Sequence, residues 1–117
     1  MQFDLTEEQR MIQDTARRFA AEEIAPTLEE EERKHEFRAE RVAKMGALGF
    51  FACALPDEDG GSGMGFMDSV LMAEQIGKVS ASWRLPFNMQ NLGPALTVAK
   101  FGTPAQKKTY IPGWVAG

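Results

Sequence analysis

The chain of 117 residues contains one cysteine and one histidine, and this scarcity restricts its chemistry. The single thiol of Cys53 excludes an internal disulfide, and we expect this residue to be a small buried hydrophobe. His35 stands in a charged segment, so we expect it on the surface rather than beside a nucleophile. The sequence therefore predicts no metal site and no catalytic residue within these 117 positions.

Long apolar runs and a basic stripe are missing as well. No segment approaches the roughly 18 apolar residues of a membrane span, and the first eight residues lack the basic and apolar regions of a signal peptide. The net charge is -4 with basic residues dispersed among acids, which argues against nucleic-acid binding. We expect a cytoplasmic protein in which residues 1–117 form a single domain.

Helix signals occupy the first third of the chain. Thr6 and Gln9 form a capping box that opens a helix whose apolar stripe ends near Pro26. The mixed charges of residues 29–36 are expected to form a solvated helix face or loop. A second helix is predicted over residues 38–48, with a glycine at position 49 as its stop.

The middle of the chain combines a glycine-rich segment with an apolar helix. Residues 60–65 contain four of the eleven glycines, but three acids precede them, so we expect an ordinary loop rather than a phosphate cradle. Residues 66–79 are apolar nearly all round and predict a helix buried on most sides. Gly77 within it permits the close approach of another helix.

The last third predicts two more helical segments. Ser82 is expected to cap a helix that has Pro86 in its first turn and a kink at residues 93–94. A capping box at residues 103–106 opens a final short helix, which Pro112 breaks. The residues predicted to point inward are Met89, Leu92, Leu96 and Ala99. With no strand or hairpin signal, the predicted fold is all-α, an orthogonal bundle of about five or six helices.

Arg84 is a permanent cation at the start of this helix, beside a large apolar surface that Asn88 interrupts. An arginine in such surroundings needs an anionic partner or a route to water. The partner is either a local carboxylate, Glu74 or Asp68, or the carboxylate of a substrate. The residues alone leave both alternatives open.

Six short motifs follow one another in a specific order: LTEEQ (5–9), FAAEEIAP (19–26), MGALGF (45–50), LPDEDGG (55–61), AEQI (73–76) and YIP (110–112). Their order and spacing resemble the N-terminal α-helical domain of the acyl-CoA dehydrogenases, over the whole chain. Asp59 departs from the family pattern, in which an aromatic residue usually precedes the Gly-Gly pair.

This resemblance implies a part of a larger flavoenzyme. In the family this α domain supplies one wall of the acyl pocket and is followed by a β domain and a four-helix bundle. The flavin segment and the catalytic glutamate lie beyond the YIP motif, so we expect FAD in the full-length enzyme and no cofactor-binding residue within 1–117. These residues alone should be inactive. The implied partners are an acyl-CoA substrate, an electron acceptor and further copies of the enzyme.

Glutaryl-CoA dehydrogenases within this family carry an arginine at the spacing of Arg84, 18 residues before Gly102. There it faces the terminal carboxylate of a dicarboxylic acyl-CoA. The resemblance therefore implies a substrate-binding site made of Arg84, Leu85, Asn88 and Met89, and a substrate such as glutaryl-CoA. Leu85 departs from the serine often found beside that arginine.

A second class of function uses the same apolar helices without any chemistry. Residues 66–79 and 85–101 carry more hydrophobic area than so small a domain should bury, so part of it is expected to be exposed and to drive association. The chain would then be a free-standing helical binding or assembly module. The sequence beyond residue 117 distinguishes the two classes, since a flavin-binding β domain there favours the enzyme.

Overall fold

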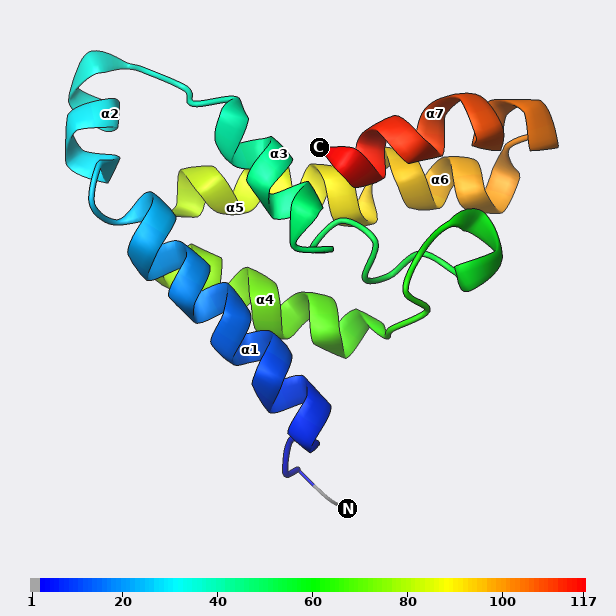
Figure 1. Cartoon of the computed structure of the whole chain (residues 1–117), viewed down its shortest axis with the longest axis horizontal. Coiled ribbons are helices and arrows are strands. Elements are labelled where there is room, and N and C mark those ends of the chain that lie inside the picture. The colour runs from blue at the N-terminus through cyan, green and yellow to red at the C-terminus, as the bar shows by residue number, and fades with distance from the viewer. Residues whose placement is uncertain (1–2) are drawn as a thin grey trace.

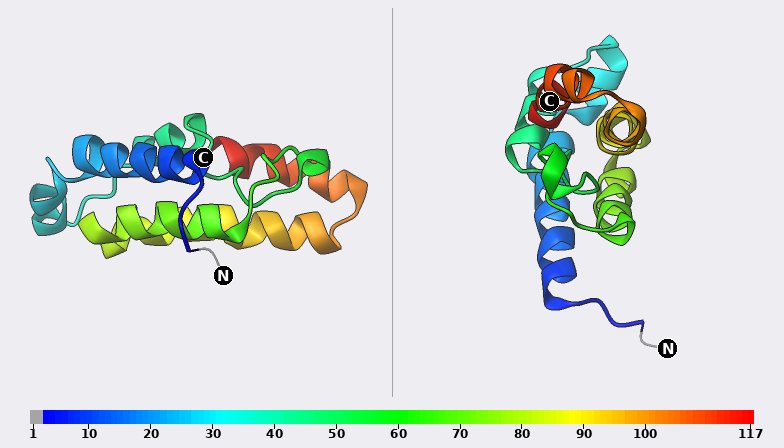
Figure 2. Two further views of the ribbon diagram at one scale, coloured as in Figure 1. Left: turned by 90° about the horizontal axis from the view of Figure 1, so that it is seen from below. Right: turned by 90° about the vertical axis from the view of Figure 1, so that its right-hand side faces the viewer.

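The protein is all-α, as the sequence predicts. A computed structural model describes residues 3–117, and no strand occurs among them. Two layers of helices form a slab of 42 × 40 × 19 Å (Figures 1 and 2). One layer contains α1 (Glu7–Phe19), α3 (Glu40–Ala47) and α7 (Pro104–Ala116), and the other contains α4 (Phe66–Val79), α5 (Ala81–Leu92) and α6 (Pro94–Phe101). The short helix α2 (Leu28–Lys34) stands at one corner of the slab (Figure 1).

Helix α1 begins and ends as the sequence predicts. The capping box is present, since Thr6 Oγ1 accepts from the backbone N–H of Gln9 and the Gln9 side chain accepts from the backbone N–H of Thr6. After Phe19 the helix widens into one π-helical turn, Ala20–Ile24, and ends before Pro26. The predicted apolar stripe packs against α4, and its residues Ala16, Ala20 and Ile24 are fully buried. The first two residues of the segment judged not to be a signal peptide lie outside the described range.

The charged segment 29–36 is solvated, as the sequence predicts, except at Glu31. It forms most of α2, and Glu31 is only 2% exposed because Arg41 of α3 binds both of its carboxylate oxygens. Its other charged members are exposed, including His35, which ends the helix in a left-handed conformation. The partner that buries Glu31 stands ten residues further along, beyond the reach of a local charge pattern.

Two apolar clusters hold the layers together. The larger one joins α1, α4 and α5 through the segment 50–53, with Phe51 and Phe87 fully buried at its centre. The smaller one lies under α6 and α7, around Leu55 and Ile111. Cys53 belongs to the larger cluster and is 1% exposed, which confirms its expected burial. Helix α3 ends near its predicted stop, where Gly49 has a φ of 78°.

The second half departs from expectation at two boundaries. Ser80, not Ser82, caps α5, because Ser80 both ends α4 and accepts from the backbone N–H of Trp83 at 3.1 Å. Pro86 consequently lies inside α5 rather than in its first turn. The kink predicted at residues 93–94 is a full break, since the backbone of Gly93 is not helical and separates α5 from α6.

Helix α7 also differs from its prediction. It opens with the expected capping box at Thr103 and Gln106 but continues through Pro112 to Ala116. Packing of its apolar side against the smaller cluster keeps the helix continuous, although the proline removes one backbone donor. Within residues 3–117, every helix falls short of the length and apolarity that crossing a bilayer would require.

Candidate functional site

The four residues predicted to bind substrate lie on one stripe of α5. Arg84, Leu85, Asn88 and Met89 occupy positions i, i+1, i+4 and i+5, which are neighbours on a helical surface. Leu85 and Met89 are 60% and 53% exposed, Arg84 is exposed, and Asn88 is partly buried. The stripe therefore presents a cation and two apolar side chains to the outside of the domain, with the partly buried amide of Asn88 beside them.

Met89 was also expected to point inward, and that expectation is wrong. The buried face of α5 carries Trp83, Phe87 and Asn91 instead, spaced four residues apart. Asn91 is fully buried because its amide donates to Ser69 Oγ at 2.9 Å. The prediction failed because the buried face includes the polar residue Asn91. Counting apolar positions alone shifts the inferred buried face toward Met89.

Arg84 lies across helix α4 at Gly77. A Cβ atom built on Gly77 would stand 3.2 Å from Arg84 Cδ, 3.9 Å from its Nε and 4.0 Å from its Cγ. The glycine that was expected to permit close helix approach thus receives the aliphatic part of an arginine from the next helix. Sequence reasoning noted the small residue but did not connect it to Arg84.

Both local acids that could neutralise Arg84 have other partners. Glu74 Oε1 lies 3.2 Å from Lys78 Nζ, one turn further along α4, and Gln75 Nε2 donates to Glu74 Oε2 at 3.2 Å. Asp68 Oδ2 accepts from the backbone N–H of Gly65 at 2.8 Å, at the start of α4. Across residues 3–117, none of the ion pairs involves Arg84.

Asn88 adds a polar group with unused capacity to the same stripe. Its Oδ1 atom is enclosed and accepts no hydrogen bond from the described residues. Asn88 stands one turn after Arg84, so the two side chains share one edge of the helix. A buried polar atom without a partner requires an explanation, and a polar ligand or a water molecule at this edge would supply one.

The apolar surface predicted for α4 and α5 is exposed, which confirms that expectation. On α4 the side chains of Phe66, Met67 and Val70 are 65%, 53% and 56% exposed. They add to the exposed Leu85 and Met89 of α5. The prediction that α4 is buried on most sides is therefore wrong, because only its face toward α1 and α5 is covered.

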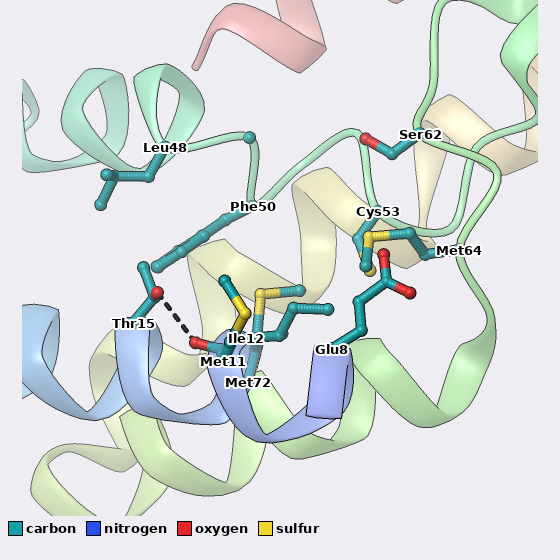
Figure 3. Close-up of a pocket in the computed structure, with 11 residues that line it drawn as sticks. Glu8, Met11, Ile12, Thr15, Leu48, Phe50, Cys53, Ser62, Met64 and Met72 are labelled. Atoms are coloured by element: carbon teal, nitrogen blue, oxygen red, sulfur yellow. Dashed lines mark hydrogen bonds between the residues drawn. The ribbon is translucent and has the colours of Figure 1, made fainter. Parts of the chain in front are cut away.

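A second candidate is a cavity of about 330 Å³ between α1 and the segment 48–64 (Figure 3). It is lined by Glu8, Met11, Ile12, Thr15, Leu48, Gly49, Phe50, Cys53, Ser62, Met64 and Met72. Figure 3 shows the sulfur atoms of Cys53 and Met64 facing one another, 4.0 Å apart. Burial raises the pKa of the Cys53 thiol, which disfavours the nucleophilic thiolate. The cavity contains none of the four predicted residues and has no nucleophile–base pair in its lining.

The glycine-rich loop does not fit the pyrophosphate of a flavin cofactor. The N–H groups of Gly60, Gly61, Ser62 and Gly63 donate to backbone carbonyls of residues 52–57 at 2.8–3.0 Å. Their donors are therefore used within the loop, and three acids stand beside them. Asp59, which departs from the family pattern, pairs with Lys107 of α7 at 3.0 Å. The expectation of an ordinary loop is confirmed, and this loop offers no cradle for a phosphate.

The described residues also hold no cluster of three or more His, Cys, Asp or Glu side chains that could bind a metal ion.

Comparison with known proteins decides the family. A family model described as the N-terminal domain of acyl-CoA dehydrogenase matches residues 6–117. The chain belongs to the acyl-CoA dehydrogenase family.

Individual members of the acyl-CoA dehydrogenase family agree with this assignment. Glutaryl-CoA dehydrogenase of Desulfococcus multivorans is 36% identical over 115 residues, which cover 96% of this chain and 30% of that protein. Acryloyl-CoA reductase (NADH) of Anaerotignum propionicum is 38% identical, over 96% of this chain and 28% of that protein. The chain thus spans about 30% of the length of the curated relatives it matches.

A solved structure gives the same result in three dimensions. The structure of a glutaryl-CoA dehydrogenase in complex with glutaryl-CoA superposes with a TM-score of 0.94 at 35% identity. The match covers 99% of this chain and 30% of that one. The resemblance inferred from six short motifs is therefore confirmed at the level of the family and of the fold.

Proposed function

We propose that the chain forms the N-terminal domain of an FAD-dependent acyl-CoA dehydrogenase that acts on a dicarboxylic acyl-CoA such as glutaryl-CoA. The observation that carries the proposal is the state of Arg84. Arg84 is an exposed residue, both neighbouring acids are bound elsewhere, and no described carboxylate pairs with it. An arginine in this state is available to a carboxylate of the substrate.

The rest of the stripe suits the remainder of such a substrate. A guanidinium holds a carboxylate through two parallel hydrogen bonds and stays charged when the ligand covers it. The partly enclosed amide of Asn88 stands beside it as a second polar group. Leu85 and Met89 offer apolar contact to the methylene groups of the acyl chain.

The remaining parts of the proposal lie outside residues 3–117. FAD, held by another part of the polypeptide, supplies the hydride acceptor for α,β-dehydrogenation, while Arg84 and its neighbours bind and orient the far end of the acyl chain. An electron acceptor, a homo-oligomeric assembly and a cytoplasmic location belong to the same proposal. The similarity to a glutaryl-CoA dehydrogenase of Desulfococcus multivorans supports the dicarboxylic substrate.

The experiment is Arg84→Ala in the full-length enzyme, assayed on glutaryl-CoA and on an uncharged acyl-CoA of similar length. A charge-assisted hydrogen bond contributes about 1.5–3 kcal/mol, so kcat/KM for glutaryl-CoA should fall roughly ten- to a hundredfold. Activity on the uncharged substrate should fall less or rise. Arg84→Lys should recover part of the loss, because lysine lacks the bidentate geometry.

An equal loss on both substrates, together with a lower unfolding midpoint, would contradict carboxylate recognition by Arg84. The competing function is a helical module without chemistry. Two observations distinguish it from the enzyme: the sequence encoded beyond residue 117 and the properties of the isolated chain. A flavin-binding domain encoded beyond residue 117 favours the enzyme, in which case the purified domain alone should lack a flavin spectrum and dehydrogenase activity. A flavin spectrum of the isolated 117 residues would contradict the proposal that FAD is bound by another part of the polypeptide.

A further inference from the structure

Gly77 occupies an unusual position for a glycine. It lies inside α4, two residues before the end of the helix, where alanine would favour the helical backbone more. Its missing side chain leaves room that the aliphatic part of Arg84 occupies, with Cδ 3.2 Å from the ideal Cβ position. Helix propensity thus disfavours glycine at position 77, but only glycine leaves room for the contact with Arg84.

The contact restricts where the guanidinium can go. A free arginine side chain samples many rotamers and loses that freedom when a ligand fixes it. Packing of Cγ, Cδ and Nε against the backbone of α4 removes part of this freedom before any ligand arrives. A preorganised arginine binds a carboxylate more tightly than one that must be ordered during binding.

The charge on the same face of α4 gives the position a second consequence. Glu74 stands three residues before Gly77, one turn away on the helix surface, and both of its oxygens already have partners. Arg84 therefore packs beside an acid without pairing with it. Because Lys78 and Gln75 hold Glu74, the guanidinium of Arg84 stays available to a ligand.

We infer that Gly77 is a positioning residue that holds Arg84 in its carboxylate-binding orientation, and that the absence of a side chain at residue 77 determines selectivity for dicarboxylic over uncharged acyl chains. This inference rests on the proposed function of Arg84. Gly77 acts through Arg84 alone and has no contact with the substrate.

The test compares two glycine-to-alanine variants of the full-length enzyme. Gly113 is the matched control, since it also lies inside an exposed helix, and a Cβ there meets no atom within 4 Å. Gly77→Ala should lower kcat/KM for glutaryl-CoA about three- to tenfold while leaving the uncharged acyl-CoA unchanged. Gly77→Val, with its larger side chain, should lower it further, and Gly113→Ala should change neither substrate.

Two additional measurements separate positioning from stability. Alanine improves helix propensity at both sites, so neither variant should lower the melting temperature. In the double variant Gly77→Ala/Arg84→Ala, the loss on glutaryl-CoA should equal that of Arg84→Ala alone, because the glycine acts only through the arginine.

The possible failures are distinguishable. If Arg84→Ala loses glutaryl-CoA activity selectively while Gly77→Ala does not, the positioning role is overturned and the proposed function stands. If Arg84→Ala shows no selective loss, the proposed function falls and takes this inference with it. Equal losses on both substrates with a lower melting temperature for Gly77→Ala would also overturn the positioning role, by marking the glycine as structural.

Discussion

Arg41 and Arg84 have the same side chain and opposite surroundings. Arg41 is 4% exposed, donates to both oxygens of Glu31 at 2.7 and 2.8 Å, and places its guanidinium carbon 4.4 Å from the centre of the Trp83 ring. Arg84, the next residue after Trp83, is exposed, packs on Gly77 and pairs with no carboxylate in the range 3–117. The first arginine has used its hydrogen-bonding capacity within the fold, and the second has kept it.

This difference indicates how a small helical domain divides its charges between folding and binding. A buried ion pair fixes two helices against each other, but removing one partner leaves a buried charge unpaired. An exposed cation contributes little to stability and can be changed without unfolding the domain. Substitution of the two arginines should therefore affect different observables.

The largest expected effect is on Arg41. Arg41→Met leaves the carboxylate of Glu31 buried without its main partner, and breaking such a pair costs about 3–5 kcal/mol. The measurement is the free energy of unfolding in urea. Arg84→Met is the matched control and should change this free energy by less than about 0.5 kcal/mol. Similar losses for the two variants would erase the contrast between the arginines.

The next effect is an acid-dependent loss of stability at the same corner. Hydrogen bonding to Arg41, partly opposed by burial, lowers the pKa of Glu31 from 4.5 to about 2. Because the folded-state pKa lies below the unfolded value, the contribution is complete above about pH 4.5 and is lost as the pH falls toward 2. The loss should be smaller than for Arg41→Met, since a protonated carboxyl still accepts a hydrogen bond.

Thermal unfolding between pH 6 and pH 2 measures this contribution. Glu31→Gln is the control, because an amide cannot titrate in this range, and its melting temperature should fall less steeply than that of the wild type. A wild-type curve parallel to the Glu31→Gln curve between pH 4.5 and pH 2 would place the acid sensitivity elsewhere in the domain.

The smallest effect on stability is expected on the apolar face of α4 and α5. Val70 is 56% and Leu85 60% exposed, so replacing each by lysine should change the free energy of unfolding by less than about 0.5 kcal/mol. The isolated domain should nevertheless associate less, because the exposed apolar area that drives association is reduced. Sedimentation equilibrium of the wild type and both variants measures the change.

Met11→Lys on α1 serves as the control for that prediction, since Met11 is 67% exposed but lies outside the α4–α5 face. It should leave the association constant unaltered. A wild-type domain that stays monomeric at high concentration would remove the association claim altogether, whatever the variants do.

Local signals predicted a large part of this fold from the sequence. The capping boxes at Thr6 and Thr103 form as expected, and the interruption at residues 93–94 falls where a kink was predicted, because each depends on residues within one helical turn. The class of the fold follows from the same signals. The boundary at Ser80 was missed because two serines two residues apart are equally good caps, and tertiary packing of Trp83 selects between them.

The misassigned residues share a different cause. Glu31 is buried by Arg41, which comes from another helix, and Asn91 is buried by its hydrogen bond to Ser69, 22 residues away in sequence. A polar residue with a distant partner cannot be told from a solvated one by its neighbours in sequence. For the candidate site the resemblance supplied Arg84, Asn88 and Met89, but the contact between Arg84 and Gly77 required the arrangement of two helices.

Because Cys53 is buried, the reactivity of its thiol reports on the opening of the larger apolar cluster. This is the one cysteine of the chain, it is 1% exposed, and it belongs to the cluster that joins α1, α4 and α5. A thiol-labelling reagent should therefore modify the domain only when that cluster separates, so the labelling rate measures the opening equilibrium without denaturant or any introduced label. The same modification would then trap the opened molecule, because the enlarged side chain no longer fits the cluster.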